Sequence, residues 1–164
     1  MRNMMLQVKN FKIIALCSLF LVALMGCKGR NEPEQTKTIA GNVSKPSWTA
    51  PSDYDMTSSM TALVEVDLSL SFKADQLAGW KLSKDDLLAA FDGNTCLGVA
   101  MVKDGQFFLY ITSPQEGNSV SLKYYSASVK NSFTATESVP YQNNSKLGSP
   151  ADPYMPKWTV SSSL

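Results

Sequence analysis

The sequence predicts an all-β protein, a single Ig-like antiparallel β-sandwich of about seven strands. Residues 60–71 alternate between apolar and mostly polar side chains, which is the period of a strand with one buried face. Six shorter apolar runs follow, and the segments between them carry Gly, Asn, Asp and Pro, the residues typical of turns. The region from residue 51 onward, about 110 residues long, is enough for one modest core and too short for two.

The expected strands follow one another in a regular order. After the first, they cover residues 87–91, 96–102, 106–112, 120–125, 133–136 and 158–160. The turns between them are expected at Asp92-Gly93-Asn94, Asp104-Gly105, Ser113-Pro114 with Glu116-Gly117-Asn118, and Gly148-Ser149-Pro150. Residues 73–86 break the pattern, and since Gly79 interrupts any helical period there, we expect a loop.

The hairpin formed by residues 87–102 is apolar on both faces. With a two-residue turn, one face holds Leu87, Ala89 and Phe91 with Cys96, Gly98 and Ala100, and the other holds Leu88 and Ala90 with Leu97, Val99 and Met101. A three-residue turn would swap these pairings and still leave both faces apolar. Such a hairpin must be covered on both sides or present a patch. The expected cover is Trp80 or the segment 154–158. The alternative is a surface for a partner protein, formed by Leu97, Val99 and Met101 with Phe108 or Tyr110.

The order of these pieces resembles a mostly uncharacterised β-sandwich module of exported proteins of Gram-negative anaerobes. The matching pieces are Met60-Thr61-Ala62, Asp86-Leu87-Leu88-Ala89-Ala90-Phe91, Cys96-Leu97-Gly98-Val99-Ala100, Phe107-Phe108-Leu109, Gly117-Asn118-Ser119-Val120 with Tyr125-Ser126-Ala127, and Gly148-Ser149-Pro150-Ala151-Asp152-Pro153. The resemblance covers roughly residues 56–160 and implies a β-sandwich accessory domain, without an activity. Many members carry a basic residue where this chain has Leu97, so we expect Leu97 to point outward and add apolar surface.

The N-terminus reads as a signal peptide over residues 1–26. The basic residues Arg2, Lys9 and Lys12 precede an uninterrupted apolar or small-residue run over residues 13–26. This run is shorter than the ~20 residues that a membrane-spanning helix needs. We therefore expect it to be removed.

The end of that run, Leu24-Met25-Gly26-Cys27, resembles the lipobox of bacterial lipoproteins. The resemblance implies that Cys27 is lipidated and that the chain is anchored in the membrane through this N-terminal lipid. Lys28 follows the cysteine instead of aspartate, which implies delivery to the outer membrane. The alternative is a plain secretory signal that ends in an accidental cysteine. Two or three acyl chains would hold the protein stably, because each buried methylene contributes ~0.8 kcal/mol.

Residues 27–50 are expected to hold the lipidated cysteine and a flexible tether. From Lys28 onward the segment is polar and carries Pro33, Gly41 and Pro46, without a sustained period. Such a composition buries too little apolar surface to order itself. The sandwich domain is then expected over residues 51–164, with Trp48 at its start.

The composition argues against catalysis, a zinc site and nucleic acid, whereas a structural calcium bound by loop oxygens stays open. The sequence contains no histidine, which removes the usual general base and most catalytic triads, so we expect no enzyme. Cys96 is the only thiol left after Cys17 is removed and Cys27 is acylated, so we expect no zinc site and no cofactor. We expect Cys96 to be a small core residue opposite Phe91. Loss of residues 1–26 takes away three of the 15 basic residues and none of the 14 acidic ones, and such near-neutrality disfavours nucleic acid.

Aromatic side chains supply the remaining candidate chemistry. Sugar rings stack on exposed aromatic faces while nearby polar groups bind the hydroxyls. Trp80, in an expected loop, and Tyr110 are the candidate ligand-binding residues. The sequence thus indicates a lipid-anchored cell-envelope binding or interaction module, with a glycan or an envelope protein as partner. The alternative is a structural accessory subunit of a larger outer-membrane or surface assembly.

Overall fold

The computed structural model describes residues 37–50, 52, 58–112 and 115–161. Contacts divide the chain after Gln35, and every described residue belongs to the second unit, Thr36–Leu164. The predicted signal peptide and Cys27 lie outside the described residues. Within the described ranges, no helix is long and apolar enough to cross a membrane. A short 3-10 turn, η2 (Leu68–Leu70), follows the first strand, and the prediction of an all-β protein is confirmed.

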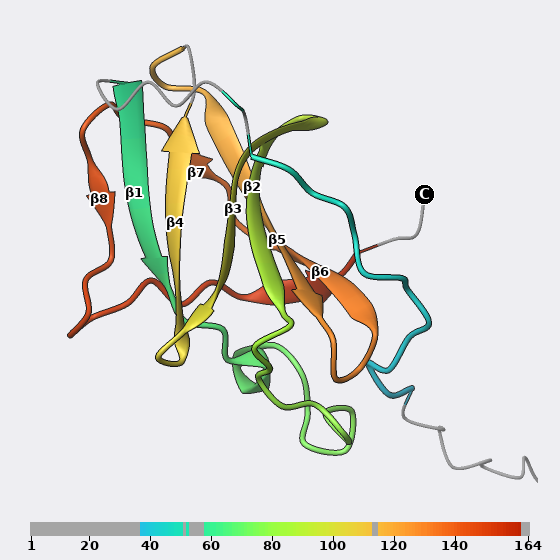
Figure 1. The fold of residues 1–164 in the computed structure, drawn as a ribbon. Helices are drawn as coiled ribbons and strands as arrows, with labels where there is room; N and C mark the ends of the chain where they lie inside the picture. Colours follow the sequence, from blue (N-terminus) through green and yellow to red (C-terminus); the bar gives the residue numbers. More distant parts are fainter. Residues whose placement is uncertain (1–36, 51, 53–57, 113–114, 162–164) are drawn as a thin grey trace, which may run out of the picture. The chain divides into compact units, whose positions relative to one another are not determined.

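In the described part of the chain, nine strands form one curled sheet in the order β8-β1-β4-β3-β2-β5-β6-β9, with β7 paired to β5 (Figure 1). Their bounds are β1 (Ser59–Val64), β2 (Leu87–Asp92), β3 (Thr95–Lys103), β4 (Gln106–Thr112), β5 (Ser119–Ser126), β6 (Asn131–Ala135), β7 (Val139–Pro140), β8 (Lys146–Leu147) and β9 (Trp158–Val160). The sheet is mixed, because β8 runs parallel to β1 while the other pairs are antiparallel. The sequence predicted about seven strands, and the two-residue strands β7 and β8 are too short to show a period.

Two tight turns fix the central hairpins where the sequence predicted them. Asp92 pairs with Thr95, so that Gly93 and Asn94 form a two-residue turn in which Gly93 has a φ of 56°. Lys103 pairs with Gln106, and the intervening Asp104 and Gly105 both have positive φ, at 52° and 82°. Positive φ at both central residues is the geometry of a type I′ turn, which matches the twist of antiparallel strands.

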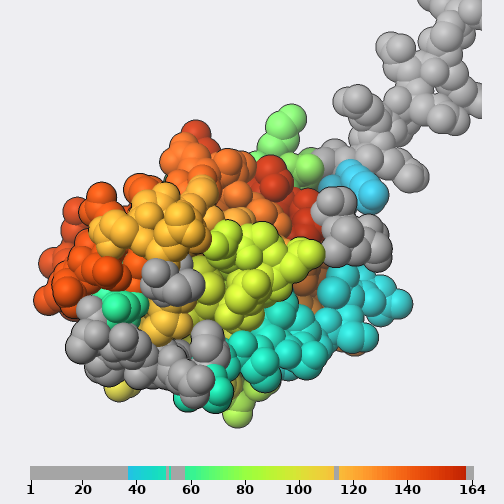
Figure 2. All heavy atoms as spheres, turned by 90° about the horizontal axis from the view of Figure 1, so that it is seen from above, coloured from blue at the N-terminus to red at the C-terminus, as the bar shows by residue number. Residues whose placement is uncertain are grey.

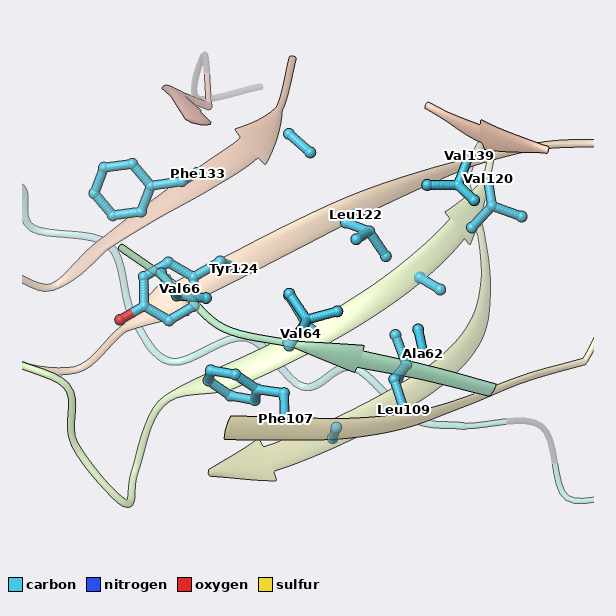
Figure 3. Close-up of a cluster of buried hydrophobic side chains, with 14 of the residues drawn as sticks. Ala62, Val64, Val66, Phe107, Leu109, Val120, Leu122, Tyr124, Phe133 and Val139 are labelled. Atoms are coloured by element: carbon cyan, nitrogen blue, oxygen red, sulfur yellow. The ribbon is translucent and has the colours of Figure 1, made fainter. Parts of the chain in front are cut away.

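The core lies inside the curl, between β1 and β4 on one side and β5 and β6 on the other (Figure 3). Val64 and Phe107 come from the first side, and Tyr124 and Phe133 from the second. The rings of Phe107 and Tyr124 pack edge to face, with their centroids 6.0 Å apart. Those of Tyr124 and Phe133 stack with centroids 5.8 Å apart. Burial of each such side chain contributes roughly 1.5–3 kcal/mol, so this cluster holds the two sides together.

Residues 37–50 lie against the sheet, although the sequence assigned them to the flexible tether. Ile39 is 3% exposed and belongs to the core cluster. The backbone N–H groups of Gly41 and Val43 donate to the carbonyls of Val129 and Lys130 at 2.9 and 2.8 Å. The Trp48 ring meets that of Phe91 edge to face at 5.7 Å. Figure 2 shows this segment, in cyan, against the yellow-green atoms of the β2–β3 region. It therefore supplies the cover that was expected from Trp80 or residues 154–158.

We expect Ile39→Ala to destabilise the domain by about 2–4 kcal/mol, because it leaves a cavity in a packed site. Val43→Ala is the matched control, since Val43 is 37% exposed and should cost less than about 0.5 kcal/mol. Urea unfolding followed by tryptophan fluorescence measures both. Equal midpoints for the two variants would show that the segment does not belong to the folded domain.

Candidate functional site

A β-bulge in β3 decides which side chains of this strand reach the surface. Ala90 pairs with Gly98 and Phe91 with Cys96, so Leu97 is an extra residue without a partner in β2. Leu97 is only 4% exposed and packs in the core cluster. The expectation that Leu97 points outward is therefore wrong, because the bulge reverses the alternation at this residue. Cys96 does lie opposite Phe91, as predicted, but it is only half-buried and lies outside the core cluster, so the prediction of a core residue is wrong.

Gly98 explains why the bulge sits where it does. A Cβ atom at this position would lie 1.9 Å from the carbonyl oxygen of Tyr110 on β4. Any larger residue would therefore push β3 away from β4. Next to it, the Thr112 hydroxyl donates to the Leu97 carbonyl at 3.2 Å and satisfies a backbone group at the irregular position.

Beyond the bulge, the register differs from the predicted one. Ala89 pairs with Val99 and Leu87 with Met101, so these side chains share the outer face, the side of the sheet away from the core cluster. Gly98 and Ala100 were expected there and lie on the inner face instead. Of the three residues predicted as a partner surface, Met101 is 57% exposed, Val99 is half-buried and Leu97 is buried.

Apolar side chains form a row across the outer face of three neighbouring strands. Leu63 of β1 pairs with Phe108 of β4, and Phe108 is 49% exposed. Val102 pairs with Phe107, which places Met101 beside Phe108 when the register is extended by one residue. Tyr110 also lies on this face, and its ring meets that of Phe108 edge to face at 5.0 Å. Phe108 thus lies between Tyr110, a predicted ligand-binding residue, and Met101, which was predicted for the partner surface together with Phe108 or Tyr110.

A hollow of about 450 Å³ lies over part of this row, and we call it the outer groove. Its lining comes from β1, β4, β8 and the turn after β8, and consists of Thr61, Leu63, Phe108, Tyr110, Lys146, Gly148, Ser149 and Pro150. The lining is mainly apolar, with hydroxyl and ammonium groups added. Such a concave, aromatic surface with a few polar groups is typical of small-ligand sites.

The turn after β8 forms one wall of the outer groove because Gly148 allows it to approach β1. Gly148 has a φ of +74°, and a Cβ atom there would lie 2.5 Å from the Leu63 carbonyl oxygen. Ser149 and Asp152 close the turn with backbone hydrogen bonds of 2.9 and 3.1 Å. The sequence predicted this turn but gave no sign that it returns to β1, so Thr61, Leu63, Lys146 and Ser149 were missed.

Trp80, the other predicted ligand-binding residue, packs against the core instead of standing free in its loop. Its Nε1–H donates to the Tyr124 hydroxyl at 3.4 Å. That hydroxyl donates in turn to the carboxylate of Asp86 at 2.6 Å. Burial raises the pKa of Tyr124, and the neighbouring Asp86 raises it further, so the phenol stays protonated and remains a donor.

Asp86 is fully buried and fixes the loop that carries Trp80. Its carboxylate accepts the backbone N–H groups of Ala127 at 2.7 Å and Ser83 at 3.0 Å, in addition to the Tyr124 hydroxyl. Three donors satisfy a buried carboxylate that would otherwise be costly. The aspartate is thus a structural group that joins the loop before β2 to β5 and to the turn after it.

The described residues contain no group of three or more side chains suited to hold a metal ion. Burial raises the pKa of the Cys96 thiol above its ordinary value, so the thiol is a poor nucleophile at neutral pH. Its Sγ donates to the Gly98 carbonyl at 3.6 Å.

Comparisons of the chain with protein-family models, with curated proteins and with solved structures found no match.

We expect Leu97→Lys and Met101→Lys to differ sharply in stability. The first places an ammonium in the core and should cost more than about 3 kcal/mol, whereas the second should stay within about 0.5 kcal/mol of the wild type. Thermal unfolding by circular dichroism measures both. A stable Leu97→Lys variant would contradict the inward orientation of Leu97.

Proposed function

We propose that this protein is a non-enzymatic, lipid-anchored module of the bacterial cell envelope that binds a glycan through the outer groove. The observation that carries the proposal is Phe108, which lies 49% exposed beside Tyr110 in a concave site. An aromatic side chain left this open in a small domain marks a contact surface, because its burial elsewhere would stabilise the fold.

The chemistry of the outer groove suits a sugar ring. Phe108 offers an aromatic surface to the apolar C–H face of the ring. Thr61, Ser149 and Lys146 supply hydroxyl and ammonium groups along the same lining, where they would bind sugar hydroxyls. A volume of about 450 Å³ is within the usual range for small-ligand sites. We therefore propose Tyr110 and its neighbours as the glycan site, and not Trp80, which packs against the core.

The proposed anchor is the lipid on Cys27, which the lipobox-like residues support. Because Ile39 packs in the core of the domain, only residues 28–38 separate the proposed lipid from the folded part. Even fully extended, that length spans roughly 40 Å at 3.3–3.6 Å per residue. We therefore propose that the domain works close to the outer membrane and not on a long tether.

A structural accessory subunit is the second candidate, and Met101 favours it. This side chain is 57% exposed and adjoins Phe108, yet it does not line the outer groove. The apolar row of Leu63, Phe108 and Met101 continues beyond the outer groove, and this longer row suits contact with a protein surface. The resemblance to an Ig-like sandwich accessory module agrees with this candidate too.

We expect Phe108→Ala to weaken polysaccharide binding by about tenfold or more, because it removes the aromatic surface. Affinity electrophoresis of the detergent-solubilised protein in gels containing xylan, pectin or hyaluronate measures the effect. Phe108→Tyr keeps the ring and should retain binding.

Met101→Ala distinguishes the two candidate functions. A glycan module should bind the polysaccharides normally with this substitution, because Met101 lies outside the outer groove. An accessory subunit should bind none of the polysaccharides. It should co-purify with a larger envelope complex, and Met101→Ala should abolish that co-purification. Absence of retardation in every gel would reject the glycan proposal.

We expect Cys27→Ala to release the protein into the soluble fraction, since no acyl chain can then be attached. Cys17→Ala is the matched control, because Cys17 lies within the expected signal peptide and its loss should leave the protein in the membrane. Cell fractionation with detection by immunoblot measures how each variant divides between the soluble and membrane fractions. A membrane-bound Cys27→Ala variant would contradict the proposed anchor.

A further inference from the structure

Among the described residues, Lys146 is the only charged side chain that lines the outer groove. Strand β8 places it beside Thr61 of β1, and Thr61 is in turn opposite Tyr110 of β4. The ammonium thus comes from the strand at one side of the aromatic lining, held there by the parallel pairing of β8 with β1. This placement depends on the fold, because Lys146 and Tyr110 are far apart in the sequence.

A second lysine of this face, Lys103, lies away from the outer groove. Lys103 is the last residue of β3 and pairs with Gln106, the first residue of β4. Tyr110, which pairs with Thr61, lies toward the other end of β4. Neither Lys103 nor Gln106 lines the outer groove. Lys146 is therefore a positive charge that faces an otherwise apolar and hydroxyl-bearing lining.

We propose that the outer groove selects an acidic sugar, one that carries a carboxylate on its ring, over a neutral one. The carboxylate would accept a charge-assisted hydrogen bond from the Lys146 ammonium, while the ring lies on Phe108. This inference rests on the proposed glycan-binding function and names the class of sugar. A lysine supplies a point charge and not a planar fork, so the contact tolerates different carboxylate orientations.

The test compares matched pairs of ligands that differ only in charge. Oligogalacturonate and hyaluronate oligosaccharides are each titrated into the detergent-solubilised full-length protein, in parallel with their carboxyl methyl esters, by isothermal calorimetry. We expect the acidic form to bind roughly tenfold more tightly than its ester in low salt, the size of effect that one charged hydrogen bond produces. The preference should shrink at higher salt, because the pair is partly exposed.

Variants at two lysines assign the preference to the outer groove. Lys146→Gln should abolish the difference between acid and ester, Lys146→Arg should keep it, and Lys103→Gln should leave it unchanged as the control on the same face. Lys146 is exposed, so none of these changes should affect the unfolding midpoint.

The outcomes separate this inference from the function on which it rests. Equal binding of acid and ester, or an acid preference that survives in Lys146→Gln, overturns the acidic-sugar inference and leaves a glycan site in place. Binding of neutral xylan alone, weakened by Phe108→Ala, would likewise overturn the acidic-sugar inference and leave the glycan site in place. Failure of every polysaccharide, acidic or neutral, overturns both proposals.

Discussion

Strand β2 is buried on both faces, and the rest of the domain is arranged to meet that requirement. Its inner side chains, such as Leu88, face the core inside the curl of the sheet. Its outer side chains, such as Phe91, need a separate cover, and the chain supplies one from its own N-terminal side. Ile39 holds that segment in the core and Trp48 packs on Phe91, while the Lys123 ammonium lies 4.4 Å from the centre of the Phe91 ring.

The same cover leaves the other half of the sheet open. The contacts of residues 39–48 are with β2, the β5–β6 region and the loop at Gln76, and Phe108 and Met101 remain about half exposed. The outer face of the sheet therefore has two parts. The part over β2 is covered by the chain itself, and the part over β4 is open to solvent. Asp86 keeps Trp80 away from the open face. It accepts a hydrogen bond from the buried Tyr124 hydroxyl, and that hydroxyl accepts the hydrogen bond of the Trp80 ring. The open face is thus the region with side chains available for a ligand.

Features set by neighbouring residues were predictable from the sequence, and those set by distant contacts were not. Turn residues predicted both central hairpins, and strand alternation predicted that Tyr110 and Met101 would reach a surface. The position of Leu97 was wrong because its bulge depends on the close approach of Gly98 to Tyr110, a contact between strands. Ile39 is one apolar residue in a polar segment, so composition alone suggested a tether. The outer groove needs the return of residues 146–150 to β1, which no local pattern indicates.

The central claim is that ligands meet the open outer face at the outer groove. Nuclear magnetic resonance mapping of the isotope-labelled protein during titration with a bound polysaccharide fragment tests it most directly, because it reports every residue at once. The account predicts shifts concentrated at Thr61, Phe108, Tyr110 and Lys146, with little change in the loop around Trp80. Shifts centred on Trp80, or spread evenly over the domain, would contradict it.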